Sequence, residues 1–140
     1  MHQFIPFQLV EIETNNYHIL ISATIGEKPV MLIVDTGASR SVIDKTYDSG
    51  VRVDGIEDTI AVGFMSDNVN IEMALLPELK IGNVSFENVP VALADLSALQ
   101  DLYTKITSLK VAGLLGCDFL VQHVVSINFN TKKFFLRTKK

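Results

Sequence analysis

The chain has 140 residues, 48% of them hydrophobic and 20% charged, which suits one domain with a substantial core and is too short for two ordinary domains. The formal net charge is −4, and the few Lys and Arg are scattered apart from a basic C-terminal end, which argues against a nucleic-acid groove. No apolar run approaches the roughly eighteen residues that cross a bilayer, so we expect a single cytoplasmic domain over residues 1–140 with no membrane partner.

Short apolar segments rich in Val and Ile, bounded by Gly, Asn or Asp, indicate a mainly β protein. The first strands are expected over residues 7–13 (FQLVEIE) and 17–25 (YHILISATI). The turn GEKP then leads into residues 30–34 (VMLIV), an apolar run typical of a strand buried on both faces. These strands form an opening hairpin that ends at Asp35.

The middle of the chain predicts two further hairpins. A helical turn is expected over residues 45–49, and strands over residues 57–64 and 68–76 then form a projecting hairpin around MSDN, residues 65–68. The segment 79–93 (LKIGNVSFENVPVAL) supplies another pair of strands. Gly82 and Asn83 match the chemistry of a two-residue hairpin loop between them.

The last third of the chain carries the expected helices. One helix, over residues 96–109 with Asp95 as N-cap, is predicted from apolar residues at helical spacing: Leu96, Leu99, Leu102, Tyr103, Ile106 and Leu109. A buried strand over residues 111–115 and a short helix capped by Asp118 follow. Two strands across NTKK, over residues 124–130 and 133–137, close the chain as a hairpin.

The segment LIVDTGASRSVI, residues 32–43, places one carboxylate at the end of an apolar strand. Gly37 allows a tight turn there, and the N–H groups of that turn can point at Asp35 and hold its geometry. The β-branched Thr36 has a restricted rotamer, so its hydroxyl can bridge to another main chain and lock the loop. The alternative is that Asp35 merely starts an Asx-turn between two strands.

The wider pattern favours a functional carboxylate, because a distant LLG at Leu114, Leu115 and Gly116 follows the predicted helix. The combination resembles the retropepsin-like aspartic proteases over most of the chain. The resemblance implies a closed β-barrel, half of an acid protease, with a flap hairpin and one or two short helices. It implies that Asp35 is catalytic within the loop of Asp35, Thr36, Gly37 and Ala38, and that Leu114, Leu115 and Gly116 cross beneath that loop. The hairpin around residues 65–68 would be the flap, with Gly63 as its flexible point. Phe64 and Met65 would either cover the substrate or serve as core or surface filler.

The resemblance also implies a homodimer, since such chemistry needs two carboxylates and the chain supplies one competent Asp. We therefore expect an aspartic endopeptidase that hydrolyses extended peptide or protein substrates with apolar residues beside the cut, by water held between two copies of Asp35. No cofactor and no metal are expected. The second hypothesis is a retropepsin-like peptide- or protein-binding module without proteolytic activity.

A second Asp-Ser-Gly begins at Asp48. No buried apolar strand precedes it, and the thirteen positions from Asp35 to Asp48 cannot hold a second half of the fold. Asp48 is therefore interpreted as part of a surface turn.

The chain also departs from the viral members that it resembles. Where these often pair an acidic residue with an arginine, this sequence has Ser39 and Cys117, and it offers no obvious flap tyrosine. The longer segment before LLG points towards a cellular member of the family.

Other catalytic or ligand-binding groups are weaker candidates. Cys117 is the only cysteine, which excludes an intramolecular disulfide and favours a buried structural thiol over a nucleophile. The three histidines lack the spacing of metal ligands; they are His2, His18 and His123. A serine nucleophile at Ser39 or Ser41 would need a distant histidine.

Overall fold

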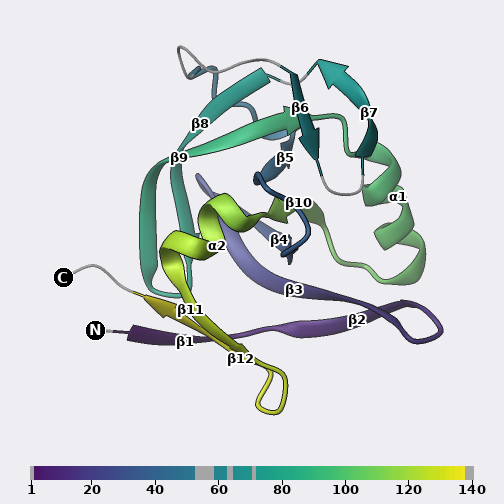
Figure 1. Ribbon diagram of the computed structural model, residues 1–140, viewed down its shortest axis with the longest axis vertical. Coiled ribbons are helices and arrows are strands. Elements are labelled where there is room, and N and C mark those ends of the chain that lie inside the picture. The colour runs from purple at the N-terminus through teal and green to yellow at the C-terminus, as the bar shows by residue number, and fades with distance from the viewer. Residues whose placement is uncertain (1, 53–58, 63–64, 71, 138–140) are drawn as a thin grey trace.

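The structure is a computed structural model that describes residues 2–52, 59–62, 65–70 and 72–137 (Figure 1). Its strands are β1 (His2–Pro6), β2 (Gln8–Glu13), β3 (Asn16–Ile25), β4 (Lys28–Val34), β5 (Val42–Asp44), β6 (Thr59–Val62), β7 (Met65–Asn70), β8 (Glu72–Ile81), β9 (Val84–Ala94), β10 (Val111–Leu115), β11 (Val124–Asn128) and β12 (Lys133–Arg137). Its helices are the 3₁₀ turn η1 (Lys45–Tyr47), α1 (Ser97–Ile106) and α2 (Cys117–His123).

Six strands close into a barrel in the order β3-β4-β10-β5-β9-β8, and β2 lies outside β3 as a further strand of the same sheet. The ring closes where β8 pairs back onto β3, with Thr24 opposite Lys80 and Ile25 opposite Leu79. The pairs β4–β10 and β5–β9 are parallel, whereas β3–β4, β5–β10 and β8–β9 are antiparallel. The predicted mainly β, closed-barrel architecture is thus confirmed.

The barrel sheet is buried on both faces near its centre. Alternate residues of β4 point to opposite sides, so Leu32 joins one apolar cluster and Ile33 joins the other. The first cluster also contains Phe134 of β12 and Phe119 of α2, while the second includes Tyr103 of α1. The apolar run of residues 30–34 therefore forms the doubly buried strand that its composition predicts.

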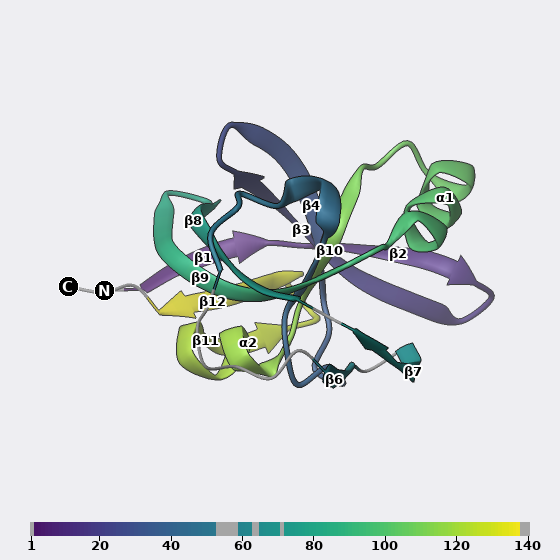
Figure 2. The same cartoon turned by 90° about the horizontal axis from the view of Figure 1, so that it is seen from above.

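A separate three-stranded sheet joins the two ends of the chain in the order β1-β12-β11. Phe4 lies opposite Phe135, and the two rings stack with centroids 4.4 Å apart, while Ile5 on the other face belongs to the core. The first and last strands of the chain, β1 and β12, accordingly run side by side in Figures 1 and 2. The sequence interpretation missed β1, because five residues that end in proline show little strand pattern until β12 pairs with them.

Several predicted elements are confirmed. These are the helical turn at η1, the hairpin of β8 and β9 across Gly82 and Asn83, the buried strand β10, and the closing hairpin of β11 and β12. Gly82 has φ +60°, a left-handed conformation that suits this tight reversal.

Four predicted boundaries are wrong. Helix α1 ends at Ile106 rather than at residue 109, and its N-cap is Leu96, while the Asp95 carboxylate accepts a 3.0 Å hydrogen bond from the Ser97 N–H. Helix α2 begins after Gly116, so Asp118 lies in its first turn instead of capping it. Met65 begins β7 and pairs with Val62, so the predicted turn residues 65–68 lie within a strand.

Among the described residues, no helix is long and apolar enough to span a bilayer.

Candidate active site

Asp35 directly follows β4, where this strand lies between β3 and β10. Its N–H donates to the Leu115 carbonyl over 3.0 Å, which continues the parallel pairing of β4 with β10 by one residue. Its Oδ1 accepts a 2.9 Å hydrogen bond from the Gly37 N–H, and its carbonyl accepts from the Ala38 N–H at 3.2 Å. The half-buried carboxylate is therefore held by the main chain of its own turn.

The tip of the loop is open to solvent. Thr36 and Gly37 are exposed, whereas Ala38 is buried in the cluster that contains Tyr103. Within the described part of the chain, the Thr36 hydroxyl has no hydrogen-bond partner, and the Thr36 carbonyl accepts from Cys117 Sγ at 3.2 Å. The loop thus presents an ordered carboxylate beside an uncommitted hydroxyl.

The structure brings LLG directly against this loop. The Cys117 N–H donates to the Ala38 carbonyl over 2.8 Å, immediately after Leu114, Leu115 and Gly116, which are all buried. A Cβ added to Gly116 would lie 2.6 Å from the carbonyl carbon and oxygen of Arg40 and 2.8 Å from the Ala38 oxygen. Only glycine at position 116 allows the two segments to approach this closely.

A buried hydrogen-bond network links the same segments beneath Asp35. The Ser41 hydroxyl, fully buried, donates to Asp118 Oδ1 at 2.8 Å and accepts from the Gly116 N–H at 3.0 Å. The same Asp118 oxygen also accepts from the N–H groups of Ser41 and Phe119 at 2.9 and 2.8 Å. The sequence interpretation missed this network because no local spacing connects residue 41 with residue 118.

Asp44 anchors the end of β5 to the start of α1. Its Oδ1 accepts from the Leu96 N–H at 2.8 Å, and its Oδ2 accepts from the Thr46 N–H and hydroxyl at 3.0 and 2.5 Å. Burial alone would raise the pKa of Asp44, but these hydrogen bonds outweigh burial and hold the pKa below its usual value. Asp44 is thus a structural carboxylate with its oxygens already occupied.

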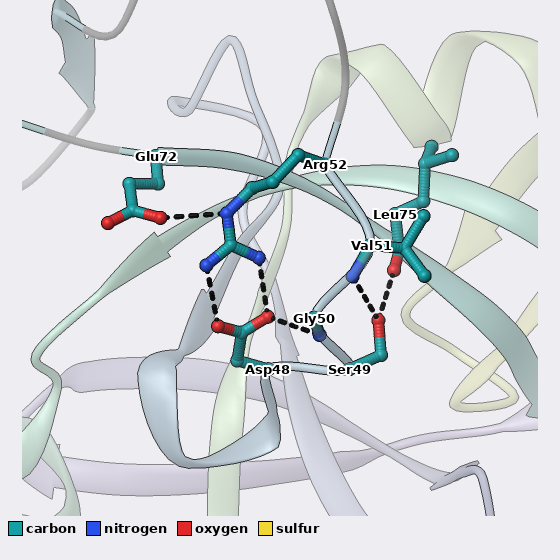
Figure 3. A network of polar contacts seen from close by, with 7 residues as sticks. All are labelled: Asp48, Ser49, Gly50, Val51, Arg52, Glu72 and Leu75. Carbon is teal, nitrogen blue, oxygen red and sulfur yellow. Dashed lines mark hydrogen bonds and ion pairs between the residues drawn. The ribbon is translucent and has the colours of Figure 1, made fainter.

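The second Asp-Ser-Gly is committed to a surface turn, as the sequence predicts. Asp48 Oδ1 accepts from the Gly50 N–H at 2.8 Å, and the carboxylate binds Arg52 with two contacts of 2.8 Å (Figure 3). Arg52 in turn donates to Glu72 at the start of β8 over 2.8 Å. The hydrogen bonds from the Arg52 guanidinium hold the pKa of Asp48 below its usual value. An exposed carboxylate in this setting is poorly suited to general acid–base work.

The hairpin expected to be the flap is formed by β6 and β7, which Figure 2 shows set apart from the barrel strands. Its register runs from Thr59 opposite Asn70 to Val62 opposite Met65. Gly63 and Phe64 lie outside the described residues. The Arg52–Glu72 ion pair and the pairing of Arg52 with Ala74 join the two chain segments that flank this hairpin.

His18 is a neighbour of Asp35 that the sequence interpretation passed over. The antiparallel pairing of β3 with β4 ends with Ile19 opposite Val34, so His18 and Asp35 are the next residues on the two sides, and the charge of Asp35 acts on the His18 ring. The sequence contained a signal for this proximity. A two-residue loop that pairs Ile25 with Lys28 determines the register of the whole hairpin, and counting back from that loop leads to His18 and Asp35.

The departures from the viral pattern have local substitutes. The Ser39 carbonyl accepts from the Asp118 N–H at 3.2 Å, and Cys117 Sγ donates to the Thr36 carbonyl, so main-chain and thiol contacts connect positions 39 and 117 to the rest of the site. Among the described residues, no group of three or more His, Cys, Asp or Glu side chains is arranged to hold a metal ion.

Comparison with known proteins identifies the family. A family model described as aspartyl protease matches residues 21–119, a span that includes both the Asp35 loop and Gly116. The crystal structure of a retropepsin-like aspartic protease from Rickettsia conorii superposes with a TM-score of 0.55 at 18% identity, covering 99% of this chain and 90% of that one. EIAV protease in complex with an inhibitor gives a TM-score of 0.47 at 18% identity, over 74% of this chain and 85% of that one. A search of curated protein sequences finds no match. On its sequence and its fold, the chain belongs to the aspartyl protease family and has a retropepsin-like barrel.

Proposed function

We propose that this protein is an aspartic endopeptidase that works as a homodimer, with Asp35 of each copy forming the catalytic pair. The observation that carries the proposal is the Asp35 carboxylate, held by the Gly37 N–H on a loop whose tip is exposed. Since the pair needs a second carboxylate and Asp48 is bound to Arg52, the economical partner is Asp35 of a second copy.

The exposed tip suits such a two-fold contact. Thr36 and Gly37 leave room for an identical loop to approach, and the uncommitted Thr36 hydroxyl could then bond to the main chain of the other copy. The network of Ser41, Gly116 and Asp118 would keep both loops rigid at the contact.

The chemistry follows from two carboxyl groups a few ångströms apart. Repulsion keeps one proton shared between them, so the ionised group can take a proton from water while that water attacks the peptide carbonyl carbon. The protonated group gives its proton to the carbonyl oxygen, forming a gem-diol. The C–N bond then breaks as the carboxyl group that took the proton from water gives it to the leaving nitrogen, while the other carboxylate takes a proton from a hydroxyl of the gem-diol. The pair thus returns to its starting state with one proton, and no covalent enzyme intermediate forms. Extended peptides with apolar side chains beside the cut are the proposed substrates, bound between the Asp35 loops and the β6–β7 hairpin.

The test is hydrolysis of a mixture of apolar peptides between pH 3 and 7, combined with sedimentation. We expect parent activity that statine-type peptides inhibit, a dimer, and a loss of about 100- to 10,000-fold in Asp35→Asn with unchanged fold and mass. Asp48→Asn is the matched control and should retain parent activity. Cleavage by Asp35→Asn at the parent rate would overturn the mechanism, and an inactive, strictly monomeric parent would support the binding module instead.

A further inference from the structure

His18 and Asp35 share one face of the β3–β4 ladder. Leu20 lies opposite Ile33, and both belong to the apolar cluster that Tyr103 completes. His18 lies two residues before Leu20 in β3, and Asp35 lies two residues after Ile33, directly beyond the end of β4. By the alternation of side chains along paired strands, both therefore fall on this same side. Directly opposed residues in an antiparallel pair have Cβ atoms about 4.5 to 5.5 Å apart, close enough for a ring and a carboxylate to interact electrostatically.

Tyr103 holds the His18 ring in place from α1. Its hydroxyl lies 2.5 Å from His18 Nδ1, and the two rings stack with centroids 5.8 Å apart. Tyr103 is fully buried, and His18 is its hydroxyl's sole hydrogen-bond partner among the described residues. Because a hydroxyl can both donate and accept, the hydrogen bond persists whether Nδ1 is protonated or not. The ring can thus gain a positive charge without losing its support.

The other charged groups near His18 are few. On β2, Val10 lies opposite His18, while Glu11 pairs with the neighbouring Tyr17. On α1, Asp101 and Lys105 are exposed, and no described ion pair joins them to His18. Asp35 and Tyr103 are therefore the titratable groups that face this ring from the elements packed against it.

We propose that His18, oriented by Tyr103, is a positioning residue that sets the acidic limit of the activity by placing a titratable charge beside Asp35. This inference rests on the proposed function and names a regulator of the same site. It agrees with the electrostatics of the ring, because burial lowers the pKa of His18 whereas attraction to Asp35 raises it. By linkage, the protonated ring must favour the ionised carboxylate to the same extent that the carboxylate favours the protonated ring.

The charge on His18 should extend activity towards lower pH. In acid, His18 is protonated, and its charge resists the second protonation that would inactivate the carboxyl pair. Without that charge the doubly protonated, inactive pair forms at a higher pH. For two charges several ångströms apart near the surface, we expect loss of the His18 charge to shift the acidic limb of the kcat/KM profile to higher pH by about half a pH unit or more.

The first experiment compares kcat/KM profiles of the parent, His18→Asn and His123→Asn. The Asn amide can reach the position of Nδ1 and bond to Tyr103 but carries no charge. His123 lies at the end of α2 and packs against Phe86 and Phe119, so its variant is the matched control. We expect the acidic limb to move upwards in His18→Asn only, while Tyr103→Phe, which frees the ring, should move it part of the way. An unmoved limb in His18→Asn, even with reduced kcat, would show a merely structural role and overturn the inference.

The second experiment needs no activity. NMR titration of the imidazole signals in the parent and in Asp35→Asn should show that the pKa of His18 falls when the carboxylate is removed, while that of His123 stays unchanged. A His18 signal indifferent to Asp35→Asn would overturn the inference whether or not the protein is a protease. A parent that cleaves no peptide, but whose His18 responds, would overturn the proposed function and still support the electrostatic pairing.

Discussion

The hydroxyl of Ser41 and the carboxylate of Asp118, 77 positions apart in the chain, meet in a 2.8 Å hydrogen bond beneath the Asp35 loop. The same hydroxyl accepts from the Gly116 N–H, so one buried oxygen joins the strand after the loop to the end of β10 and the start of α2. A single buried side chain thus links the segments that contact the Asp35 loop.

Ser41→Ala removes this link and leaves the buried Gly116 N–H without its acceptor. We expect a loss of about 1 to 3 kcal/mol in the free energy of unfolding, measured by urea denaturation. Ser39→Ala is the matched control, because the Ser39 side chain is exposed, and it should change stability by less than about 0.5 kcal/mol. Equal stability of both variants would contradict the role assigned to Ser41.

Gly116→Ala tests the close approach of the two motifs. Its Cβ would meet the main chain of Arg40 at 2.6 Å, and a main-chain atom cannot swing aside as a side chain can. We expect a loss of about 1 to 3 kcal/mol on thermal or urea unfolding. In the control Gly37→Ala, the new Cβ meets only a side-chain oxygen of Asp35, at 3.2 Å, so a smaller loss is expected. A larger loss of stability in Gly37→Ala than in Gly116→Ala would show that the loop tolerates displacement at position 116.

Asp44→Asn should destabilise the fold by about 1 to 3 kcal/mol at pH 7, because an amide cannot accept on both sides as the carboxylate does. The difference in the free energy of unfolding between the parent and Asp44→Asn should depend on pH. Because folding lowers the pKa of Asp44, the ionised carboxylate stabilises the fold above its unfolded pKa of about 3.9, and this stabilisation is lost as the pH falls through the lower pKa of the folded state.

The measurement is urea denaturation of the parent and Asp44→Asn at pH 7, 4 and 3, with exposed Asp101→Asn as the control. The difference in the free energy of unfolding between the parent and Asp44→Asn should decrease towards pH 3. A difference that stays constant from pH 7 to pH 3 would mean that the ionised form of Asp44 contributes nothing to stability.

Mixed dimers test whether each site needs two copies of Asp35. If parent and Asp35→Asn chains are unfolded together in equal amounts and refolded, random pairing leaves about one quarter of the dimers with both carboxylates. Activity should then be about one quarter of that of the same total amount of parent, compared with about one half if each chain acted alone. Mixing the parent with Asp48→Asn controls for refolding and should preserve full activity.

The local features of the chain were predictable because they depend on short-range rules. Alternating apolar residues predict most strands, and Gly82 and Asn83 predict a turn. The loop from Asp35 to Ala38 is predicted by its place at the end of an apolar strand. The errors lie where tertiary contacts compete with those rules. Asp118 has the residue type of a helix cap, yet its Oδ1 is taken by Ser41, and helix α2 begins after Gly116 instead.

The sequence by itself determined which segments form strands and turns and where the Asp-Thr-Gly loop and LLG stand in the chain. Only the tertiary structure decided that β10 pairs in parallel with β4, that β1 joins β12, and that Gly116 lies against Arg40. It also decided that the Tyr103 hydroxyl meets the His18 ring, on which the charge of Asp35 acts. The physical reason is that strand period and turn chemistry act over a few residues, whereas pairing between distant segments depends on which apolar faces can share one core.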